Sequence, residues 1–144
     1  MLVAAINWDP TRPSLSVEEV LEHDTNRQYV ESWQRPGDFG VIATDDDGAA
    51  VGAAWCRLFT STERGYGYVG DHIPEISIGV VEDRRGQGVG TLLLAELEGA
   101  ARARGVCALS LSVESANPAR RLYERRGYRR VNVSGDSETM RLEL

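Results

Sequence analysis

The sequence predicts a mixed α/β fold, a sheet that is mostly antiparallel and flanked by helices. Two observations carry this prediction. Residues 74–113 read as strand, helix, strand, which is typical of a parallel pair joined by a right-handed crossover. On both sides of that unit, β-prone runs surround short turns and indicate antiparallel hairpins. The chain has 144 residues, the usual size of one domain, so we expect residues 1–144 to form a single domain.

The first third of the chain predicts a strand and then a helix. Residues 1–7 are apolar and predict a short strand, after which two prolines interrupt the chain. Ser16 and Glu19 match a capping box, in which each side chain satisfies the other residue's backbone N–H. The helix that Ser16 opens is expected to reach about Trp33, and a break near Asp24 is left open.

The middle of the chain predicts a hairpin and the strand that enters the crossover. Strands are expected at 39–44 and 49–59, because an Asp-Gly turn between β-prone runs is a good hairpin signal. Residues 60–71 are rich in Gly, Ser, Thr and Tyr and predict a surface loop. Residues 74–81 predict a strand, and Gly79 inside it indicates that another backbone or a ligand comes close.

The last part predicts two helices that alternate with strands. The expected elements are a helix at 89–104 ending at Gly105, a strand at 106–113, a helix from Asn117-Pro118 to Gly127, and strands at 128–133 and 139–144. In the first of these helices, Leu93, Leu97, Ala100 and Ala101 keep helical spacing and predict the buried face. Glu98 and Arg102 are spaced as an i,i+4 ion pair.

Composition and charge limit the function. With 42% hydrophobic and 26% charged residues the chain is ordinary for a globular protein, and its net charge of −6 argues against a general nucleic-acid binder. Cys56 and Cys107 lie in apolar runs and are expected to be buried, reduced thiols. His23 and His72 are far apart, so no metal site is predicted. No signal peptide or membrane span is recognisable, so we expect a cytoplasmic protein without a membrane partner.

The strongest local signal is the loop between the predicted strand at 74–81 and the helix at 89–104. It reads Arg84-Arg85-Gly86-Gln87-Gly88-Val89-Gly90. Glycines permit close approach, and the free N–H groups of a helix start attract phosphates. The loop has no lysine for a P-loop, and its GxGxG spacing fails the dinucleotide fingerprint. A phosphate cradle and a glycine-rich turn without a ligand both remain open.

Two motifs resemble the GNAT acetyltransferases. That family's pyrophosphate loop reads Arg/Gln-x-x-Gly-x-Gly/Ala, and Arg85, Gly88 and Gly90 match it between a strand and a helix. Downstream, residues 117–128 (NPARRLYERRGY) resemble the family segment Asn-x-x-Ala-x-x-Leu-Tyr-x-x-x-Gly-Phe, with the alanine shifted. The likeness covers residues from about 39 to 144 and is weaker before them.

The resemblance implies an acyl-CoA N-acyltransferase fold, in which the parallel strands splay apart to admit acetyl coenzyme A. No metal is implied. The residues that would contact this cosubstrate are Ile78, Gly79 and Val80 on the strand, Arg85, Gly86, Gln87, Gly88, Val89, Gly90 and Thr91 at the loop, and Asn117.

The resemblance also implies catalytic residues. Glu75 corresponds to a position where several family members place a catalytic glutamate, either directly or through water. Other members use a glutamate on the following strand, where this chain has Ser112. Tyr123 matches the tyrosine that protonates the leaving thiolate, and a backbone N–H within 78–81 would hold the oxyanion. The alternatives are a solvated carboxylate at a strand start for Glu75 and a core tyrosine for Tyr123.

The predicted function is transfer of an acetyl group from acetyl coenzyme A to a primary amine, by direct attack in a ternary complex. The acceptor, a small molecule or a peptide, would lie near residues that include Trp33, Tyr66, Tyr68, Asp71 and His72. A non-catalytic sensor of acyl coenzyme A and an interaction protein with an idle glycine loop are the alternatives. The resemblance leaves a homodimer open, since dimers are common among relatives.

Overall fold

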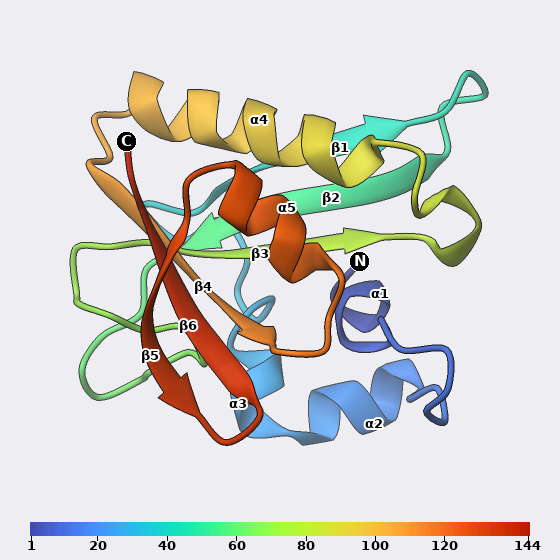
Figure 1. The fold of residues 1–144 in the computed structure, drawn as a ribbon, viewed down its shortest axis with the longest axis horizontal. Coiled ribbons are helices and arrows are strands. Elements are labelled where there is room, and N and C mark those ends of the chain that lie inside the picture. The colour runs from blue at the N-terminus through green and yellow to red at the C-terminus, as the bar shows by residue number, and fades with distance from the viewer.

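The computed structural model describes residues 1–144, and its six strands form one mixed sheet (Figure 1). The elements are α1 (Leu2–Ile6), α2 (Val17–Glu22), α3 (Asp24–Arg27), β1 (Phe39–Thr44), β2 (Ala50–Arg57), β3 (Glu75–Val80), η1 (Glu82–Arg84), α4 (Val89–Ala103), β4 (Ala108–Glu114), α5 (Ala119–Arg125), β5 (Arg129–Ser134) and β6 (Ser137–Glu143). The predicted α/β fold class is therefore confirmed.

The sheet has the strand order β1-β2-β3-β4-β6-β5, and only β3 and β4 run parallel. The other neighbours pair antiparallel, from β1 with β2 at one edge to β5 with β6 at the other. Helices α4 and α5 pack on one face of the sheet, and α1, α2 and α3 lie on the other side (Figure 1). The crossover from β3 through α4 to β4 is the unit that the strand–helix–strand pattern predicted.

The first hairpin forms where the Asp-Gly turn predicted it. The side chain of Asp45 accepts hydrogen bonds from the N–H groups of Asp47 at 3.2 Å and Ala49 at 2.9 Å. These bonds satisfy backbone N–H groups of the turn that have no partner in the strand ladder. β1 and β2 then pair from Phe39 opposite Cys56 to Thr44 opposite Ala50.

The predicted helix from Ser16 to Trp33 is shorter and broken. The capping box is present, with Ser16 and Glu19 bonded in both directions at 2.7 and 3.2 Å. Side chains then end α2: the Asn26 amide donates to the Val20 carbonyl and Arg27 donates to the Leu21 carbonyl. Those carbonyls would otherwise accept the next helical N–H groups, so the chain restarts as α3.

The strand predicted for residues 1–7 is wrong, because Leu2–Ile6 forms the helix α1. A short apolar run does not distinguish a strand from a buried helical turn by periodicity. The α1 backbone packs across β3 at Gly79, where an added Cβ would lie 2.3 Å from the Met1 carbonyl oxygen. The close approach that Gly79 indicated is therefore made by the protein's own N-terminal backbone.

Two side-chain predictions also need correction. Glu98 does not pair with Arg102 but is buried and pairs with Arg126 at the end of α5. Tertiary contact thus overrides the local i,i+4 spacing and ties α4 to α5. Cys56 is a buried free thiol as predicted, whereas Cys107 is free but exposed, since it lies in the turn just before β4.

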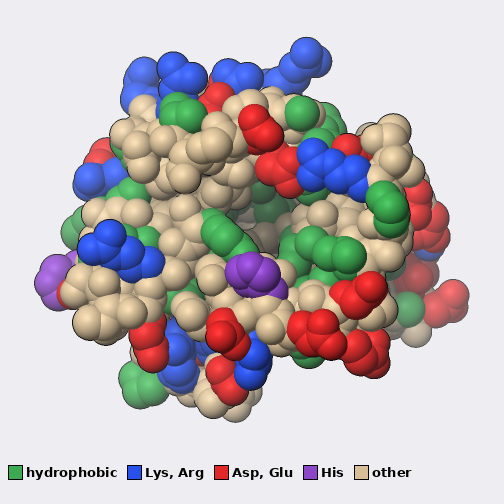
Figure 2. Space-filling view, turned by 90° about the horizontal axis from the view of Figure 1, so that it is seen from below, with side chains coloured by type: hydrophobic (Ala, Val, Ile, Leu, Met, Phe, Trp, Pro, Cys, Tyr) green, Lys and Arg blue, Asp and Glu red, His purple; other side chains and the backbone are tan.

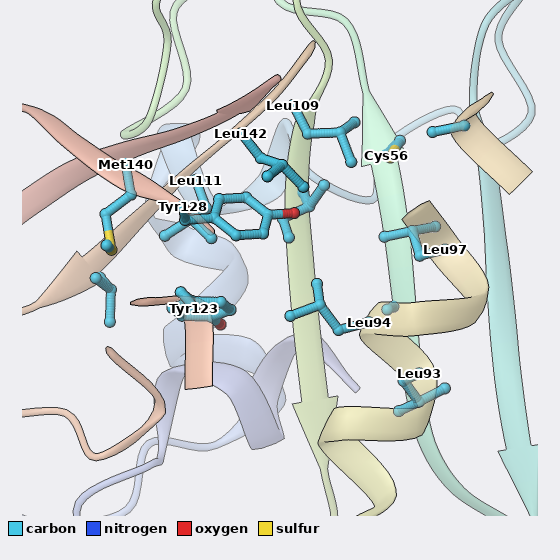
Figure 3. Close-up of a cluster of buried hydrophobic side chains, with 14 of the residues drawn as sticks. Cys56, Leu93, Leu94, Leu97, Leu109, Leu111, Tyr123, Tyr128, Met140 and Leu142 are labelled. Atoms are coloured by element: carbon cyan, nitrogen blue, oxygen red, sulfur yellow. The ribbon is translucent and has the colours of Figure 1, made fainter. Parts of the chain in front are cut away.

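The main core lies between the sheet and the helices α4 and α5 (Figure 3). Leu93, Leu97 and Ala101 are buried on the predicted face of α4, together with Leu94. α4 has 15 residues, and none of the helices combines the length and apolar character that crossing a membrane requires.

We expect Leu94→Ala to lower the free energy of unfolding by about 2–5 kcal/mol, because it removes a fully buried side chain from this core. Leu92→Ala on the same helix is the control, since Leu92 is 58% exposed and should change stability by less than about 0.5 kcal/mol. Urea denaturation of both variants measures the difference. Equal effects would contradict the described packing of α4.

Candidate functional site

The parallel strands β3 and β4 separate soon after they meet. They share the register pair Glu75–Ser110, and the Ser110 N–H donates to the Pro74 carbonyl at 3.0 Å. β2 continues to pair with β3 as far as Val80, and β6 continues to pair with β4 as far as Glu114. Each strand is therefore held by its outer neighbour while a gap opens between them. This is the splayed parallel pair that was predicted.

Part of the β3 backbone faces this gap. Successive residues of a strand direct their N–H and C=O groups alternately to its two neighbours. The Val81 N–H bonds the Val51 carbonyl of β2, whereas the Pro74 carbonyl bonds β4. The even-numbered residues between them therefore face β4. Beyond the single register pair, the N–H and C=O of Ile78 and the N–H of Val80 face the gap, whereas the Val80 carbonyl accepts a hydrogen bond from Arg85.

The glycine-bearing loop and the start of α4 lie at the wide end of the gap. Gly86 and Gly88 have φ angles of 73° and 88°, in the left-handed region that favours glycine, and nothing lies within 4 Å of an added Cβ at either. No side chain caps α4, and the Leu92 N–H makes the first helical bond, to Gly88. The N–H groups of residues 89–91 therefore have no helical partner.

Some side chains of the loop serve the loop itself. The Gln87 amide donates to the Asp83 carbonyl at 2.8 Å, and Val89 packs against the hydrophobic core. Arg84 is partly exposed and lies 3.8 Å from a carboxylate oxygen of Asp45. The backbone, more than these side chains, faces the open space.

Arg85 reaches away from the loop to the N-terminal segment. Its guanidinium donates to four backbone carbonyls, those of Val80 at 3.1 Å, Ala4 at 2.9 Å, Asn7 at 3.1 Å and Trp8 at 3.3 Å. The resemblance implied a cofactor contact for Arg85. The structure places its charged group on the C-terminal end of α1, where a cation stabilises the helix dipole and its free carbonyls.

A cavity of about 630 Å³ follows the gap and reaches both sides of the sheet. Leu122 of α5 lines it on one side, and Leu2 and Ile6 of α1 line it on the other. The predicted site residues that line it are Glu75, Ile78, Gly79, Val80, Arg85, Gly86, Gly88, Gly90, Thr91, Asn117 and Tyr123. Gln87 and Val89 do not. The cavity therefore brings together residues from both ends of β3, the loop and α5.

Glu75 is buried at the narrow end of the gap, with 3% of its surface exposed. One carboxylate oxygen, Oε1, accepts hydrogen bonds from the Tyr29 hydroxyl at 2.5 Å and the Gly67 N–H at 2.8 Å. The other, Oε2, has no partner. Burial raises the pKa of Glu75 to about 7, although the two hydrogen bonds act to lower it. Both protonation states are therefore populated near neutral pH.

The loop that follows β2 packs tightly around this carboxylate. A Cβ on Gly65 would lie 2.3 Å from Glu75 Oε2 and 2.7 Å from the Tyr29 hydroxyl oxygen. The Tyr66 N–H donates to that same hydroxyl at 2.7 Å. Tyr29 thus connects the carboxylate to the loop, and its position is fixed from both sides.

Tyr123 lines the cavity from α5 and is 6% exposed. Its ring meets Tyr128 edge-on, with centroids 5.7 Å apart. Burial raises the pKa of Tyr123 above the ordinary value for a phenol. Asn117 lies just before α5 and accepts a hydrogen bond from the Ala119 N–H at 2.9 Å.

The residues proposed to surround an acceptor do not all lie at one site. Tyr66 lines the cavity, whereas Tyr68 donates to Asp71 outside it. His72 lines a different cavity, and Trp33 lies against the Arg57 guanidinium. Sequence reasoning missed Tyr29 and Asn26, which also line the main cavity. Nothing in their local pattern indicates this, because the contacts that place them at the cavity, Tyr29 with Glu75 and Asn26 with Tyr66, span 46 and 40 residues.

The sequence profile of the Acetyltransferase (GNAT) family matches residues 3–128 of the chain. The chain belongs to this family. A mycothiol acetyltransferase from Thermobispora bispora is 32% identical over 111 residues, which are 76% of this GNAT chain and 36% of that protein. The chain therefore spans about a third of the length of this curated relative.

Solved structures support the same membership. A ribosomal-protein-alanine N-acetyltransferase from Brucella melitensis superposes with a TM-score of 0.65 at 26% identity, over 95% of this GNAT chain and 83% of that chain. A GNAT superfamily phosphinothricin acetyltransferase from Sinorhizobium meliloti, solved in complex with acetyl coenzyme A, has a TM-score of 0.61 at 26% identity. That superposition covers 75% of this chain and 62% of the other.

We expect Arg85→Gln to increase hydrogen exchange at least about tenfold at the Ala5 and Asn7 amides, which form the α1 backbone bonds. Hydrogen bonds to a charged group contribute about 1.5–3 kcal/mol each, and about 1.4 kcal/mol corresponds to a factor of ten. Arg84→Gln is the control, because Arg84 does not contact α1. A similar change in both variants would show that Arg85 does not hold the N-terminal segment.

Proposed function

We propose that residues 1–144 form a catalytic domain that transfers the acetyl group of acetyl coenzyme A to a primary amine. One observation carries this proposal. The uncapped start of α4 and the buried carboxylate of Glu75 face the same cavity, at opposite ends of the strand β3. A phosphate cradle at one end and a proton acceptor at the other are what amine acetylation by an acyl coenzyme A requires.

The residues present fit the cosubstrate. The free N–H groups of residues 89–91 and the open space at Gly86 and Gly88 would receive the pyrophosphate. The Ile78 backbone and the Val80 N–H, which face the gap, would pair with the pantetheine arm. The related acetyltransferase structure with acetyl coenzyme A bound supports this assignment. The bound thioester would supply an activated acetyl group.

Glu75 is proposed as the base. A protonated amine cannot attack a carbonyl carbon, so a proton must leave the nitrogen before or during attack. The Tyr29 hydroxyl and the Gly67 N–H occupy Oε1, whereas Oε2 is buried beside Gly65 without a hydrogen-bond partner, so it would accept this proton through water. A pKa of about 7 suits a group that must accept a proton and later release it near neutral pH.

Tyr123 is proposed to protonate the sulfur as the C–S bond breaks. Its raised pKa keeps the phenol protonated at neutral pH, so it can donate. A backbone N–H of β3 in the gap would stabilise the oxyanion. The new C–N bond forms as the C–S bond breaks in the same complex. The nitrogen loses two protons in all: one passes to Glu75 and returns to solvent, and the other replaces the proton that Tyr123 gave to the sulfur.

Direct attack is favoured over an acetylated cysteine. Burial raises the pKa of the Cys56 thiol well above its ordinary value, which disfavours the nucleophilic thiolate. Cys107 is exposed but lines the separate cavity that also includes His72. Neither thiol lines the cavity that contains Glu75 and Tyr123.

The cosubstrate site can be tested with Gly90→Leu. A Cβ on Gly90 would make only ordinary contacts, 3.7 Å from Leu122 and 3.9 Å from Val80, so the longer side chain would fill the cavity beside the phosphate cradle. We expect calorimetric binding of acetyl coenzyme A to weaken at least about a hundredfold, or about 2.7 kcal/mol. Gly99→Leu on the same helix is the control, because an added Cβ there meets nothing within 4 Å.

Absence of acetyl coenzyme A binding by the folded wild-type protein would overturn the proposed function. Binding that Gly90→Leu leaves unchanged would place the cosubstrate elsewhere. Tight binding without acetylation of any amine would instead indicate a sensor of acyl coenzyme A.

The pH dependence of kcat/KM tests Glu75. The base must be ionised to accept a proton, so kcat/KM should rise with pH through about 7. Glu75→Gln should remove this limb and lower the rate about 10²–10⁴-fold. Tyr29→Phe removes a hydrogen bond that lowers the pKa of Glu75, so its limb should move to higher pH. A limb that survives in Glu75→Gln would assign the titration to another group, such as the acceptor amine.

A further inference from the structure

The two ends of the cavity differ in charge. On the side of the loop, α4 and α5, the basic residues Arg84 and Arg125 line it. On the side of α1 and α3, the lining includes Glu75, Tyr66 and Asn26. We propose that this second end is the acceptor subsite and that it selects primary amines carrying no carboxylate, phosphate or other anionic group. The inference rests on the proposed acetyl transfer and specifies its acceptor.

Strand alternation determines which side chains reach this end. Ile78 and Val80 pack against the core on the α4 side. Glu75, Ser77 and Gly79 therefore project to the other side, where the Tyr29 hydroxyl meets Glu75 and the Met1 carbonyl lies over Gly79. On β4 the same alternation turns Ser112 toward this side, because its neighbours Leu111 and Val113 lie in the core.

The polar groups at this end are neutral, apart from Glu75. They are the hydroxyls of Tyr29, Tyr66, Ser77 and Ser112 and the amide of Asn26. The basic residues that line the whole cavity are Arg84, Arg85 and Arg125, and Arg85 is occupied by the N-terminal carbonyls. Arg85 uses four of its five N–H groups in its backbone bonds, so an anionic group on the acceptor would find at most one free guanidinium N–H at this end.

This end of the cavity stabilises an ammonium group but destabilises a carboxylate. An ammonium can approach the Glu75 carboxylate and transfer a proton to it through water. A carboxylate would lose water, find at most one free N–H of Arg85 as a cationic donor, and lie near another carboxylate, each of which is unfavourable. The exposed acidic residues on α2, namely Glu18, Glu19 and Glu22, add a field of the same sign, whereas Asp24 on α3 is paired with Arg27.

Figure 2 shows the molecule from the side on which α2 and α3 lie in Figure 1. The surface is hollowed near its centre, and hydrophobic side chains border the hollow. A histidine lies at the lower border of the hollow, acidic side chains lie above and below it, an arginine lies at its upper right, and a row of arginines occupies the far edge. The surface around the hollow therefore carries charges of both signs, and the preference for a cation rests on the residues that line the cavity.

Tyr66 is the residue at this end that a solute meets first. It is 52% exposed, and its ring stacks on Tyr29 at a centroid distance of 6.0 Å. Its hydroxyl donates to Asn26 Oδ1 at 3.0 Å, and its N–H donates to the Tyr29 hydroxyl. The exposed ring face, fixed by these contacts, attracts an ammonium and offers nothing to an anion. Tyr66 is therefore the specificity-determining residue of the subsite.

The test compares 4-aminobutanamide with 4-aminobutanoate. The two have the same chain length, and the differing group is several bonds from the amine. Initial rates with saturating acetyl coenzyme A give kcat/KM for each. We expect the amide to be preferred at least about tenfold. An equal rate or a preference for the carboxylate would overturn the inference.

Matched variants assign the preference to Tyr66. Tyr66→Arg places a cation at the opening and should shift the ratio toward 4-aminobutanoate by about tenfold or more. Tyr66 is half exposed and its backbone bond to Tyr29 does not depend on the side chain, so the fold should persist. Tyr68→Arg in the same loop is the control, since Tyr68 does not line the cavity. A shift of equal size in both would indicate a general charge effect and contradict a subsite at Tyr66.

A binding measurement separates this inference from the proposed function. Saturation-transfer NMR of the same two amines, with coenzyme A present, needs no turnover. If no amine is acetylated but the amide binds in preference to the carboxylate, the subsite stands and the acetyltransferase proposal fails. If acetylation occurs without that preference, the acetyltransferase proposal stands and the subsite inference fails. If neither amine is bound, the subsite inference fails as well.

Discussion

The separation of β3 from β4 after the pair Glu75–Ser110 is the constraint on which the rest of the site depends. A parallel pair that stayed in register would satisfy its own backbone groups and close the sheet. Here β2 pairs with the outer edge of β3, and β6 pairs with the outer edge of β4. The gap therefore lowers the stability of the sheet only by the hydrogen bonds that β3 and β4 do not make with each other. Those omitted bonds leave polar backbone inside a 630 Å³ cavity that reaches both sides of the sheet.

The same separation explains why Glu75 can be buried and still be reactive. It lies at the last point where the strands meet, so packing excludes water from one side while the cavity opens on the other. Tyr29 and Gly67 satisfy a single oxygen, which keeps the carboxylate in one orientation. Desolvation then raises the pKa of Glu75 to about 7. Position, orientation and basicity thus follow from the same local packing.

The N-terminal segment links the two strands at the wide end of the gap. Arg85 holds its carbonyls beside β3, and Glu114 at the end of β4 accepts the Trp8 indole N–H at 3.2 Å and pairs with Arg12 at 2.7 Å. The glycine loop and the N-terminal helix are therefore mechanically connected through one guanidinium. Arg85 belongs to the GNAT loop motif, but its guanidinium positions the N-terminal segment, which lines the side of the cavity opposite to the phosphate cradle.

The sequence by itself determined the elements from residue 39 onward, the parallel crossover and the loop at Gly86–Gly90, because turn chemistry, capping and periodicity act over a few residues. It did not determine α1, whose five apolar residues suit a strand or a helix until β3 offers Gly79 as a surface. It also did not determine the partners of Arg85, Glu98 and Glu75, which come from distant segments. Only tertiary structure decided these, because burial makes each charged group take whichever partner the packed chain brings within reach.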